Sequence, residues 1–255
     1  MKTKVKALKV VHIFNNLLIF DEICYNTNVQ FGGIDMAKVS IKSKRLNIVL
    51  MTDEELKAMI DNENREDLKT AYTEMLKGSR KNPNDRMWFA PWKIILRSEN
   101  KQIGSIGFHG SVENHAVEIG YGIDNDYRNQ GYATEAVDAL LNVAFDEEDV
   151  YFVEAEAEES NEYSIRLLKK LGFYEDGRGK EGIRFTKDKK IEGYWTAMGM
   201  CIGMCLGVAL GSLVFSSMAI GIGVGMCMGL GLGASKDERE KKLLKEYKEQ
   251  RKKSE

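Results

Sequence analysis

Proline, cysteine and histidine are scarce in this chain of 255 residues, which contains two prolines, four cysteines and three histidines. Cys201 and Cys205 lie four residues apart in an apolar run that has no neighbouring histidine or acid. A structural zinc site needs four ligands, and two cysteines alone do not supply them, so no metal site is predicted. Because the cysteines do not form a secreted disulfide framework, we expect a reducing cytoplasm.

The chain also lacks a large excess of positive or negative residues: its formal net charge is −2. Binding to nucleic acid requires a clustered cationic surface, so nucleic acid is not expected as the main partner. The length suits one domain with appendages or two small domains. Eleven of the 24 glycines lie between Gly193 and Gly233, and this local excess divides the chain into parts.

Residues 1–35 lack the complete pattern of a signal peptide. A histidine and two asparagines interrupt their apolar stretch, and no small-residue cleavage site follows it. The codons of Gly32 and Gly33 can encode a ribosome-binding site at the right distance from a start codon at Met36. We therefore expect translation to begin at Met36; the alternative is a genuine, weakly ordered N-terminal arm.

Residues 36–190 show the alternation of strands and helices that is typical of an α/β domain. Thr52 and Glu55 form a capping box at the start of the first expected helix. β-branched and aromatic residues predict strands at 46–50, 92–98, 102–109, 116–123, 151–158, 173–177 and 182–187. The other helices are expected at 65–76, 132–145 and 161–171. This order indicates a mixed sheet that is covered by helices.

The loop Arg128–Ala133 connects a predicted strand directly to a predicted helix. A helix N-terminus offers unpaired N–H groups and the positive end of the helix dipole, which suit a pyrophosphate. Gly131 and Ala133 allow the backbone to approach a ligand closely, and Arg128 adds a positive charge. The alternative for such a short motif is a capped turn without a ligand.

Three ordered motifs make residues 43–189 resemble the GNAT superfamily of N-acetyltransferases, within it the branch that acetylates the N-termini of ribosomal proteins. They are Glu118–Tyr121 (E-I-G-Y), Arg128–Ala133 (R-N-Q-G-Y-A), and Asn161 with Ser164 followed by Lys170–Phe173 (K-L-G-F). The resemblance implies a mixed sheet that splays between the strand ending near Asp124 and the strand from Tyr151. Acetyl-CoA would occupy that gap.

The resemblance also implies which residues bind acetyl-CoA. Asn161 is expected to bind its pantetheine arm. The complete set of expected cofactor-binding residues is Ile123, Arg128, Asn129, Gln130, Gly131, Tyr132, Ala133, Thr134 and Asn161.

Acetyl transfer needs a neutral amine, since only the free base attacks a thioester. Glu118 is the candidate base, acting through a water, because it lies on a strand whose end adjoins the expected acetyl site. The alternative for Glu118 is an ion pair with a neighbouring cation, and His109 and His115 are the alternative bases. Backbone N–H groups near Tyr121 and Ile123 are expected to hold the oxyanion.

The leaving thiolate must also gain a proton. Many GNAT enzymes use a tyrosine one helical turn beyond the serine of the N-x-x-S motif, but Leu168 occupies that position here. Ser164 is therefore the expected proton donor, with Tyr163 as the alternative.

Residues 195–234 form a separate segment, and no charged residue occurs between Gly193 and Ser235. Glycines recur at a spacing of four, which places each set on one face of a helix. The two sets are Gly199, Gly203, Gly207 and Gly211, and Gly221, Gly225, Gly229 and Gly233. Each expected helix is about 27–30 Å long, the hydrocarbon thickness of a bilayer.

The residues that flank this glycine-zipper hairpin indicate its orientation in a membrane. Tyr194 and Trp195 suit a membrane interface, and lysines and arginines lie on both sides of 195–234. Both ends, and the catalytic domain, are then expected in the cytoplasm. The alternative is a soluble hairpin that drives self-association. Residues 235–255 are expected to form an exposed charged helix or a disordered tail.

Two functions follow from these patterns. The first is an acetyl-CoA-dependent N-acetyltransferase that acts on a primary amine by direct attack and carries a membrane or oligomerisation segment. The second is a non-catalytic acetyl-CoA sensor attached to the same hairpin. The motifs are intact apart from the missing tyrosine, which favours the enzyme.

Overall fold

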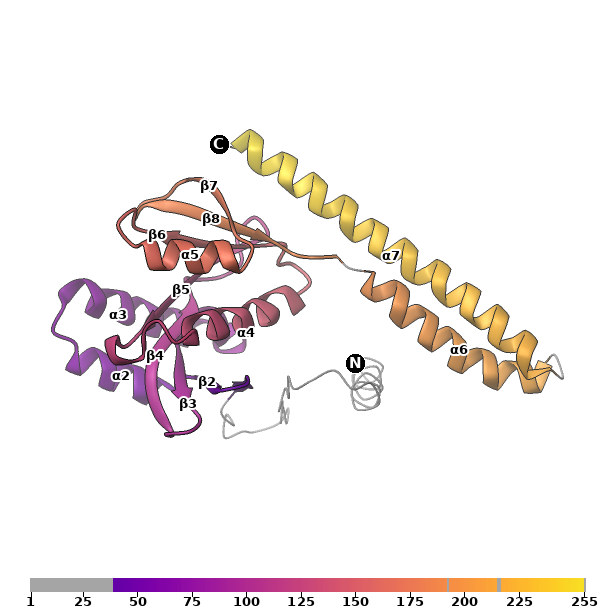
Figure 1. The fold of residues 1–255 in the computed structure, drawn as a ribbon, viewed down its shortest axis with the longest axis horizontal. Helices are drawn as coiled ribbons and strands as arrows, with labels where there is room; N and C mark the ends of the chain where they lie inside the picture. Colours follow the sequence, from indigo (N-terminus) through magenta and orange to yellow (C-terminus); the bar gives the residue numbers. More distant parts are fainter. Residues whose placement is uncertain (1–38, 192, 215–216, 255) are drawn as a thin grey trace. The chain divides into compact units, whose positions relative to one another are not determined.

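The computed structural model describes residues 39–191, 193–214 and 217–254 (Figure 1). The expected N-terminal extension 1–35, the start at Met36 and Cys24 lie outside the described residues. The chain forms two compact units. The first contains Val117–Ala144, Glu154–Phe185 and the chain up to Ser111; the second contains Val112–Ala116, Phe145–Val153 and Thr186–Glu255.

Eight strands form one mixed sheet in the order β1-β2-β3-β4-β5-β6-β8-β7. Antiparallel pairing joins β1 through β5, and Gly107 lies opposite Gly120 and Ser105 opposite Gly122 between β4 and β5. The strands are β1 (Ser40–Lys42), β2 (Leu46–Leu50), β3 (Trp92–Leu96), β4 (Lys101–Phe108), β5 (Ala116–Ile123), β6 (Phe152–Ala157), β7 (Tyr174–Arg178) and β8 (Ile183–Asp188). The expected mixed α/β fold is confirmed, with β1 as an additional strand.

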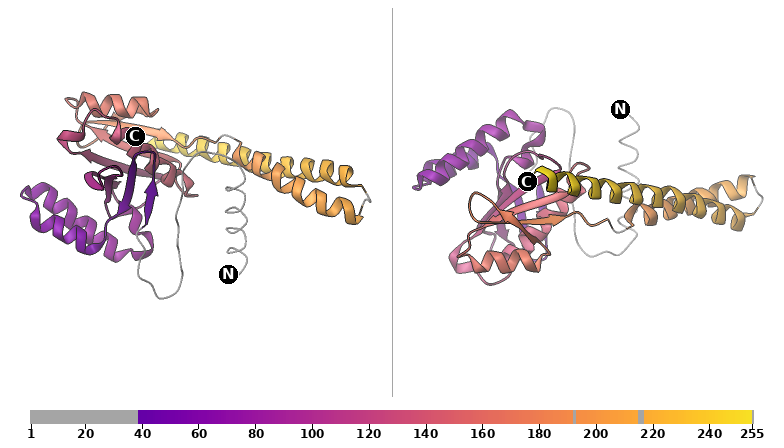
Figure 2. Two further views of the ribbon diagram at one scale, coloured as in Figure 1. Left: turned by 60° about the horizontal axis from the view of Figure 1, so that its bottom comes forward. Right: turned by 90° about the horizontal axis from the view of Figure 1, so that it is seen from above.

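Local sequence signals explain where the helices of the first unit begin. The Thr52 side chain accepts a hydrogen bond from the Glu55 N–H, and the Glu55 carboxylate accepts one from the Thr52 N–H, so the expected capping box is present. The α-helices are α2 (Asp53–Asn62), α3 (Glu66–Lys81), α4 (Tyr132–Asp146) and α5 (Glu162–Lys170), with short 3-10 turns η1 (Pro83–Trp88) and η2 (Asn125–Tyr127). Figure 2 shows α2 and α3 side by side.

The core of the first unit is built from the apolar faces of the sheet and of α4. Alternate residues of β3 are buried, as period-two patterning requires. The α4 residues Ala136, Val137 and Leu140 are fully buried, so this helix is fixed along its length. A fixed α4 holds the loop before it in place.

The second unit contains a helical hairpin of α6 (Tyr194–Val214) and α7 (Met218–Ser254). The two expected glycine rows form its contact face. A Cβ added to Gly203 would collide with the carbonyl oxygen of Gly225, and one added to Gly225 would collide with that of Gly203. By contrast, Gly223 and Gly231 face open space. Only the zipper glycines therefore permit this close backbone approach.

Asp237 of α7 caps the beginning of α6. This carboxylate is 4% exposed. It accepts hydrogen bonds from the backbone N–H groups of Trp195 and Thr196, at 3.1 and 2.9 Å. A cap from the opposite helix fixes the register of the hairpin at its base.

Of the two expectations for the charged segment 235–255, an exposed helix or a disordered tail, the structure shows the helix, which continues α7 without a break as far as Ser254. Within the second unit, Leu243, Leu244 and Tyr247 pack against a cluster of Ala116, Tyr151 and Phe152. The Tyr247 ring also stacks on the His115 ring with 3.7 Å between centroids. Apolar residues on one face thus order this lysine-rich segment.

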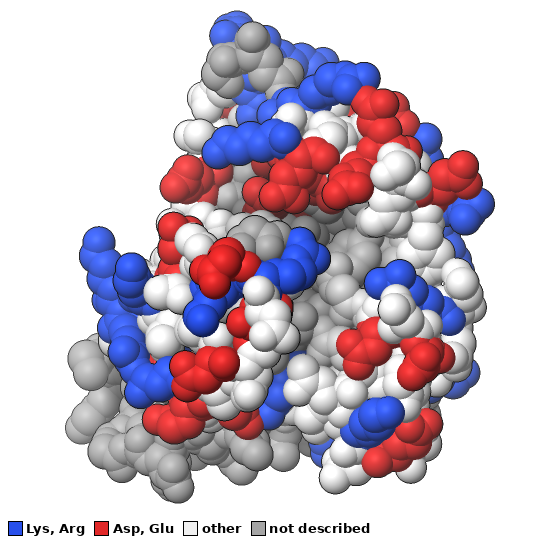
Figure 3. Space-filling model, turned by 90° about the vertical axis from the view of Figure 1, so that its left-hand side faces the viewer, with Lys and Arg blue, Asp and Glu red and all other residues white. Residues whose placement is uncertain are grey.

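Among the described helices, one, Met218–Lys253, is long and apolar enough to cross a membrane, and the apolar stretch Tyr194–Val208 of α6 is shorter. Large apolar side chains on the hairpin are exposed, including Leu206 at 58% and Leu232 at 74%. On the face drawn in Figure 3, positive and negative side chains are interspersed.

Candidate active site

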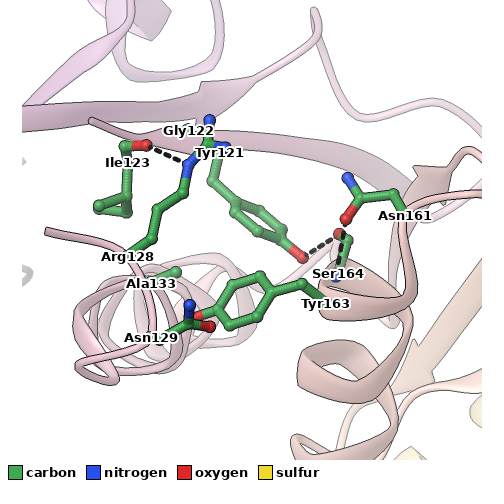
Figure 4. A pocket seen from close by; sticks show the side chains of 9 residues that line it. All are labelled: Tyr121, Gly122, Ile123, Arg128, Asn129, Ala133, Asn161, Tyr163 and Ser164. Carbon is green, nitrogen blue, oxygen red and sulfur yellow. Dashed lines mark hydrogen bonds between the residues drawn. The ribbon is translucent and has the colours of Figure 1, made fainter. Parts of the chain in front are cut away.

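A cavity of about 320 Å³ lies between the C-terminal part of β5, the loop before α4 and the start of α5 (Figure 4). Nine residues line it: Tyr121, Gly122, Ile123, Arg128, Asn129, Ala133, Asn161, Tyr163 and Ser164. The set includes Ser164 and five of the expected cofactor-binding residues: Ile123, Arg128, Asn129, Ala133 and Asn161. The fold thus brings the second and third sequence motifs into one wall.

The loop Arg128–Ala133 turns sharply before α4. Asn129 and Gly131 have positive φ angles of 60° and 80°, a conformation that asparagine tolerates and glycine favours. The Arg128 Nε donates a hydrogen bond to the Ile123 carbonyl at 3.1 Å, which ties the loop to the end of β5. The α4 N-terminus therefore opens beside the cavity.

The expected residues Gln130, Gly131, Tyr132 and Thr134 do not line the cavity. Arg45 holds two of them from outside, because its Nη1 donates to the Gln130 carbonyl at 2.9 Å and its guanidinium lies 4.4 Å from the Tyr132 ring centroid. These residues shape the loop and the first turn of α4 rather than forming the cavity wall.

Sequence reasoning missed the group that anchors Arg45, which is Glu135 in the first turn of α4. Its carboxylate accepts hydrogen bonds from Ser43 Oγ at 2.7 Å and from Arg45 N at 2.6 Å and Nε at 2.7 Å. Burial raises the pKa of Glu135, but the hydrogen bonds from Ser43 and Arg45 outweigh it, so the net pKa is lowered. An ionised Glu135 keeps the loop bound to the start of β2.

The α5 N-terminus supplies two cavity residues through its cap. Asn161 Oδ1 accepts a hydrogen bond from the Ser164 N–H at 3.1 Å. Ser164 is 8% exposed, and its Oγ lies 2.7 Å from the Tyr121 Oη. Leu168, one turn further on, is fully buried. The Tyr121 side chain was not assigned a role from the sequence, although its place on β5 three residues after Glu118 puts it on the opposite face of the strand.

Glu118 does not line this cavity. It lies on the other face of β5, where its Oε1 is 3.1 Å from His109 Nδ1. The ring of His109 fits because residue 120 is a glycine: a Cβ there would lie 2.5 Å from His109 Nε2. Glu118 and His109 were separate candidates for the base, and the structure joins them into one pair.

The pair favours its charged forms. The hydrogen bond from His109 lowers the pKa of Glu118, and the hydrogen bond to Glu118 raises the pKa of His109. The third candidate base, His115, belongs to the second unit, where its Nδ1 lies 3.2 Å from the Asp149 carbonyl oxygen and its ring stacks on Tyr247. His115 is therefore accounted for by structural contacts within that unit.

A second cavity, of about 630 Å³, adjoins the first. Gly122, Ile123 and Arg128 line both of them. The remaining walls of the second cavity are Met59, Tyr72, Gln102, Gly104, Ser105, Asp124, Asn125 and Asp126. Ser105 lies opposite Gly122 in the sheet, so both face the same side as Glu118. The two cavities meet at the end of β5.

Comparison with known proteins identifies the family of the chain. Residues 43–174, just over half of the chain, match the family described as acetyltransferase (GNAT) domain. The chain belongs to the GNAT acetyltransferase family. Residues 192–239 match a second family, described as glycine zipper membrane protein.

Two curated relatives of this GNAT chain come from Bacillus subtilis. The uncharacterized N-acetyltransferase YnaD is 37% identical over 90 residues, which are 35% of this chain and 53% of the relative. The putative ribosomal N-acetyltransferase YdaF is 32% identical over 81 residues, 31% of this chain and 44% of the relative. The chain spans about half the length of the curated relatives it matches.

Among solved structures, an acetyltransferase of the GNAT family from Bacillus anthracis is 26% identical, with a TM-score of 0.44. The match covers 59% of this chain and 98% of that one. Within the part of the GNAT chain that the structure describes, no three histidine, cysteine or acidic residues are grouped so that they could hold a metal ion.

Proposed function

We propose that the chain is an acetyl-CoA-dependent N-acetyltransferase that transfers the acetyl group to a primary amine by direct attack in a ternary complex. The observation that carries this proposal is the shared wall of the first cavity. It combines the loop at the N-terminus of α4 with Asn161 and Ser164 from α5. This combination offers a site for an anion, for an amide-bearing arm and for a thiol within one cavity.

The residues of this cavity fit acetyl-CoA. The N-terminus of α4 and the Arg128 guanidinium would hold the pyrophosphate, since both favour negative charge. Ala133 is 3% exposed and has only a methyl group, which leaves the wall open to a close ligand. Asn161, whose Oδ1 caps α5, would bind the pantetheine arm through its Nδ2 group.

The second cavity is the proposed entry for the amine. It lies on the Glu118 face of β5 and joins the first cavity at Gly122, where an added Cβ would meet no atom within 4 Å. An acceptor there would reach the acetyl group from the side opposite Tyr121. The Glu118–His109 pair would accept its proton through a water.

The cost of deprotonation indicates the class of acceptor. At pH 7 a lysine amine with a pKa near 10.4 costs about 4–5 kcal/mol to deprotonate, whereas an α-amine costs about 1 kcal/mol. A protein N-terminus or a small amine of low pKa is therefore the proposed acceptor.

We propose that the glycine-zipper hairpin attaches the enzyme to the cytoplasmic membrane. The exposed apolar side chains of α6 and α7 suit contact with lipid, and Trp195 lies at the base of the hairpin. Lys187 and Lys189 precede the hairpin and Lys236 follows it, so the positive-inside rule places both ends in the cytoplasm. Self-association of the hairpin is the alternative.

Calorimetry with acetyl-CoA tests the placement of the cofactor. Gly131→Glu should abolish binding, because it adds a negative charge to the loop that would hold the pyrophosphate and forces a side chain onto a backbone with a φ of 80°. Gly131→Asn is the matched control, since asparagine tolerates this conformation without adding charge, and its loss of affinity should be much smaller. Unchanged binding by folded Gly131→Glu would refute the placement. Binding by the native chain without release of CoA in the presence of amines would favour the acetyl-CoA sensor.

A further inference from the structure

Two hydroxyl groups from distant parts of the chain meet in the wall of the proposed acetyl-CoA cavity (Figure 4). Tyr121 reaches across from β5, and Ser164 lies in the first turn of α5. Their oxygen atoms are 2.7 Å apart, the usual distance for a hydrogen bond between hydroxyls. The fold has to bring residues 43 positions apart into contact to make this bond.

The proposed reaction needs a proton at this wall. When the C–S bond of the thioester breaks, its electron pair stays on sulfur, and the thiolate must be protonated to leave as a thiol. Leu168 has no acidic proton and is fully buried. The hydroxyl-bearing residues that line the cavity are Tyr121, Tyr163 and Ser164. Of these three, Tyr121 and Ser164 form a hydrogen bond with each other.

We propose that Tyr121 and Ser164 act as one proton-donating pair for the leaving thiolate, with Tyr121 as the positioning residue and proton source for Ser164. This inference rests on the proposed acetyl transfer. Leu168 cannot donate a proton from its position on α5, and the inference assigns this role to a tyrosine on β5 instead.

One proton passes along the pair for each thiol that leaves. The Ser164 hydroxyl gives its proton to the thiolate sulfur, and the Ser164 oxygen takes the proton of the Tyr121 hydroxyl. Solvent water reprotonates the resulting phenolate. The amine proton leaves on the other face of β5 through the Glu118–His109 pair, so the products are the acetylated amine and CoA thiol.

The surroundings of the pair suit a donor. Burial raises the pKa of Tyr121, although the hydrogen bond with Ser164 lowers it in part, and the net shift is upward. The phenol therefore stays protonated throughout the neutral range. The cap by Asn161 holds the backbone of Ser164, so the serine oxygen is fixed beside the tyrosine.

Single-turnover CoA release by the full chain, with acetyl-CoA and a reactive amine, tests the pair. Tyr121→Phe and Ser164→Ala should each slow the chemical step by about 10²-fold, the low end of general acid catalysis. The double variant should be no slower than the slower single variant, because the two groups act in series. Tyr127→Phe is the matched control, since it removes a tyrosine hydroxyl that donates to Glu99 at 2.8 Å outside the cavity, and its rate should stay native.

Fluorinated tyrosine at position 121 separates a proton source from a structural hydroxyl. It keeps the hydroxyl but lowers the phenol pKa, so the alkaline limb of the rate profile should move to lower pH by a similar amount. An unmoved alkaline limb, full activity of Tyr121→Phe, or losses that multiply in the double variant would overturn the inference. Calorimetric binding of acetyl-CoA confirms that each variant is folded. If the native chain binds acetyl-CoA but releases no CoA, the proposed function fails, and this inference fails with it.

Discussion

At the scale of single residues, strand β5 separates two kinds of chemistry. Glu118 and His109 lie on one face as a hydrogen-bonded pair, and Tyr121 lies on the other, bonded to Ser164. The alternation of side chains along a strand produces this separation with residues only three positions apart. In the proposed reaction, the base and the acid would thus act on opposite sides of one acetyl group.

Replacing Glu118 with glutamine should reduce turnover strongly at pH 7 and much less at pH 9. At the higher pH more of the amine is already neutral, so a base contributes less. Steady-state rates at both pH values, with a saturating α-amine, check this. A loss of equal size at both pH values would show that Glu118 is structural or binds substrate.

The same variant should change the titration of His109. Because the partner carboxylate raises the pKa of His109, Glu118→Gln should lower that pKa, as an imidazole NMR titration would show. The two pKa shifts also make the stability of the fold depend on pH. The raised pKa of His109 stabilises the fold at pH values below its unfolded pKa, and this contribution is lost as the pH rises through the folded pKa. The lowered pKa of Glu118 contributes above its unfolded pKa and is lost as the pH falls through the folded pKa.

At the scale of elements, α6 and α7 depend on the absence of side chains. A Cβ on any zipper glycine from Gly199 to Gly211 would come into conflict with the backbone of α7. Glycine costs about 1 kcal/mol in a helix relative to alanine, so the close approach of the two helices has to offset this cost. The hairpin is accordingly sensitive to which glycines are replaced.

Replacing Gly203 and Gly225 with leucine should separate the helices, while partitioning into membranes persists or increases because the segment becomes more apolar. Leucine at Gly223 and Gly231 is the matched control, since both positions face open space and the added apolarity is equal. Carbonate extraction and cross-linking of native, zipper and control proteins would distinguish the two effects.

If the zipper and control variants lost compact packing or self-association equally, the position of the glycines on the contact face would not matter, and only their number in the segment would. A native protein that is fully soluble and monomeric without detergent would contradict both the membrane role and the self-association role of the hairpin.

At the scale of the whole molecule, sequence patterns predicted most elements and part of the site. Capping and alternation are local signals, so β2, α2 and β5 could be placed closely. The β1 strand has three residues, too few for a periodic signal. The segment after Ser235 is packed through tertiary contacts of Tyr247, and the lysine-rich composition of this segment does not reveal those contacts.

The contrast between local sequence signals and tertiary contacts also explains which residues of the candidate site could be predicted. The loop Arg128–Ala133 and the pair Asn161 and Ser164 lie in short motifs, so the sequence alone indicated them. The anchoring of Arg45 by Glu135 joins residues 90 positions apart, and the contact of Tyr121 with Ser164 joins two separate motifs. Only the folded sheet brings such residues together.

Acetyl transfer is tested most directly by the initial rate of CoA release by the full-length chain over a grid of acetyl-CoA and amine concentrations at pH 7. Direct attack in a ternary complex predicts amine-dependent release with intersecting double-reciprocal lines, one acetyl group gained by the amine, and faster reaction of α-amines than of lysine side chains. Parallel lines would contradict direct attack, and the absence of amine-dependent CoA release from a chain that binds acetyl-CoA would contradict acetyl transfer itself.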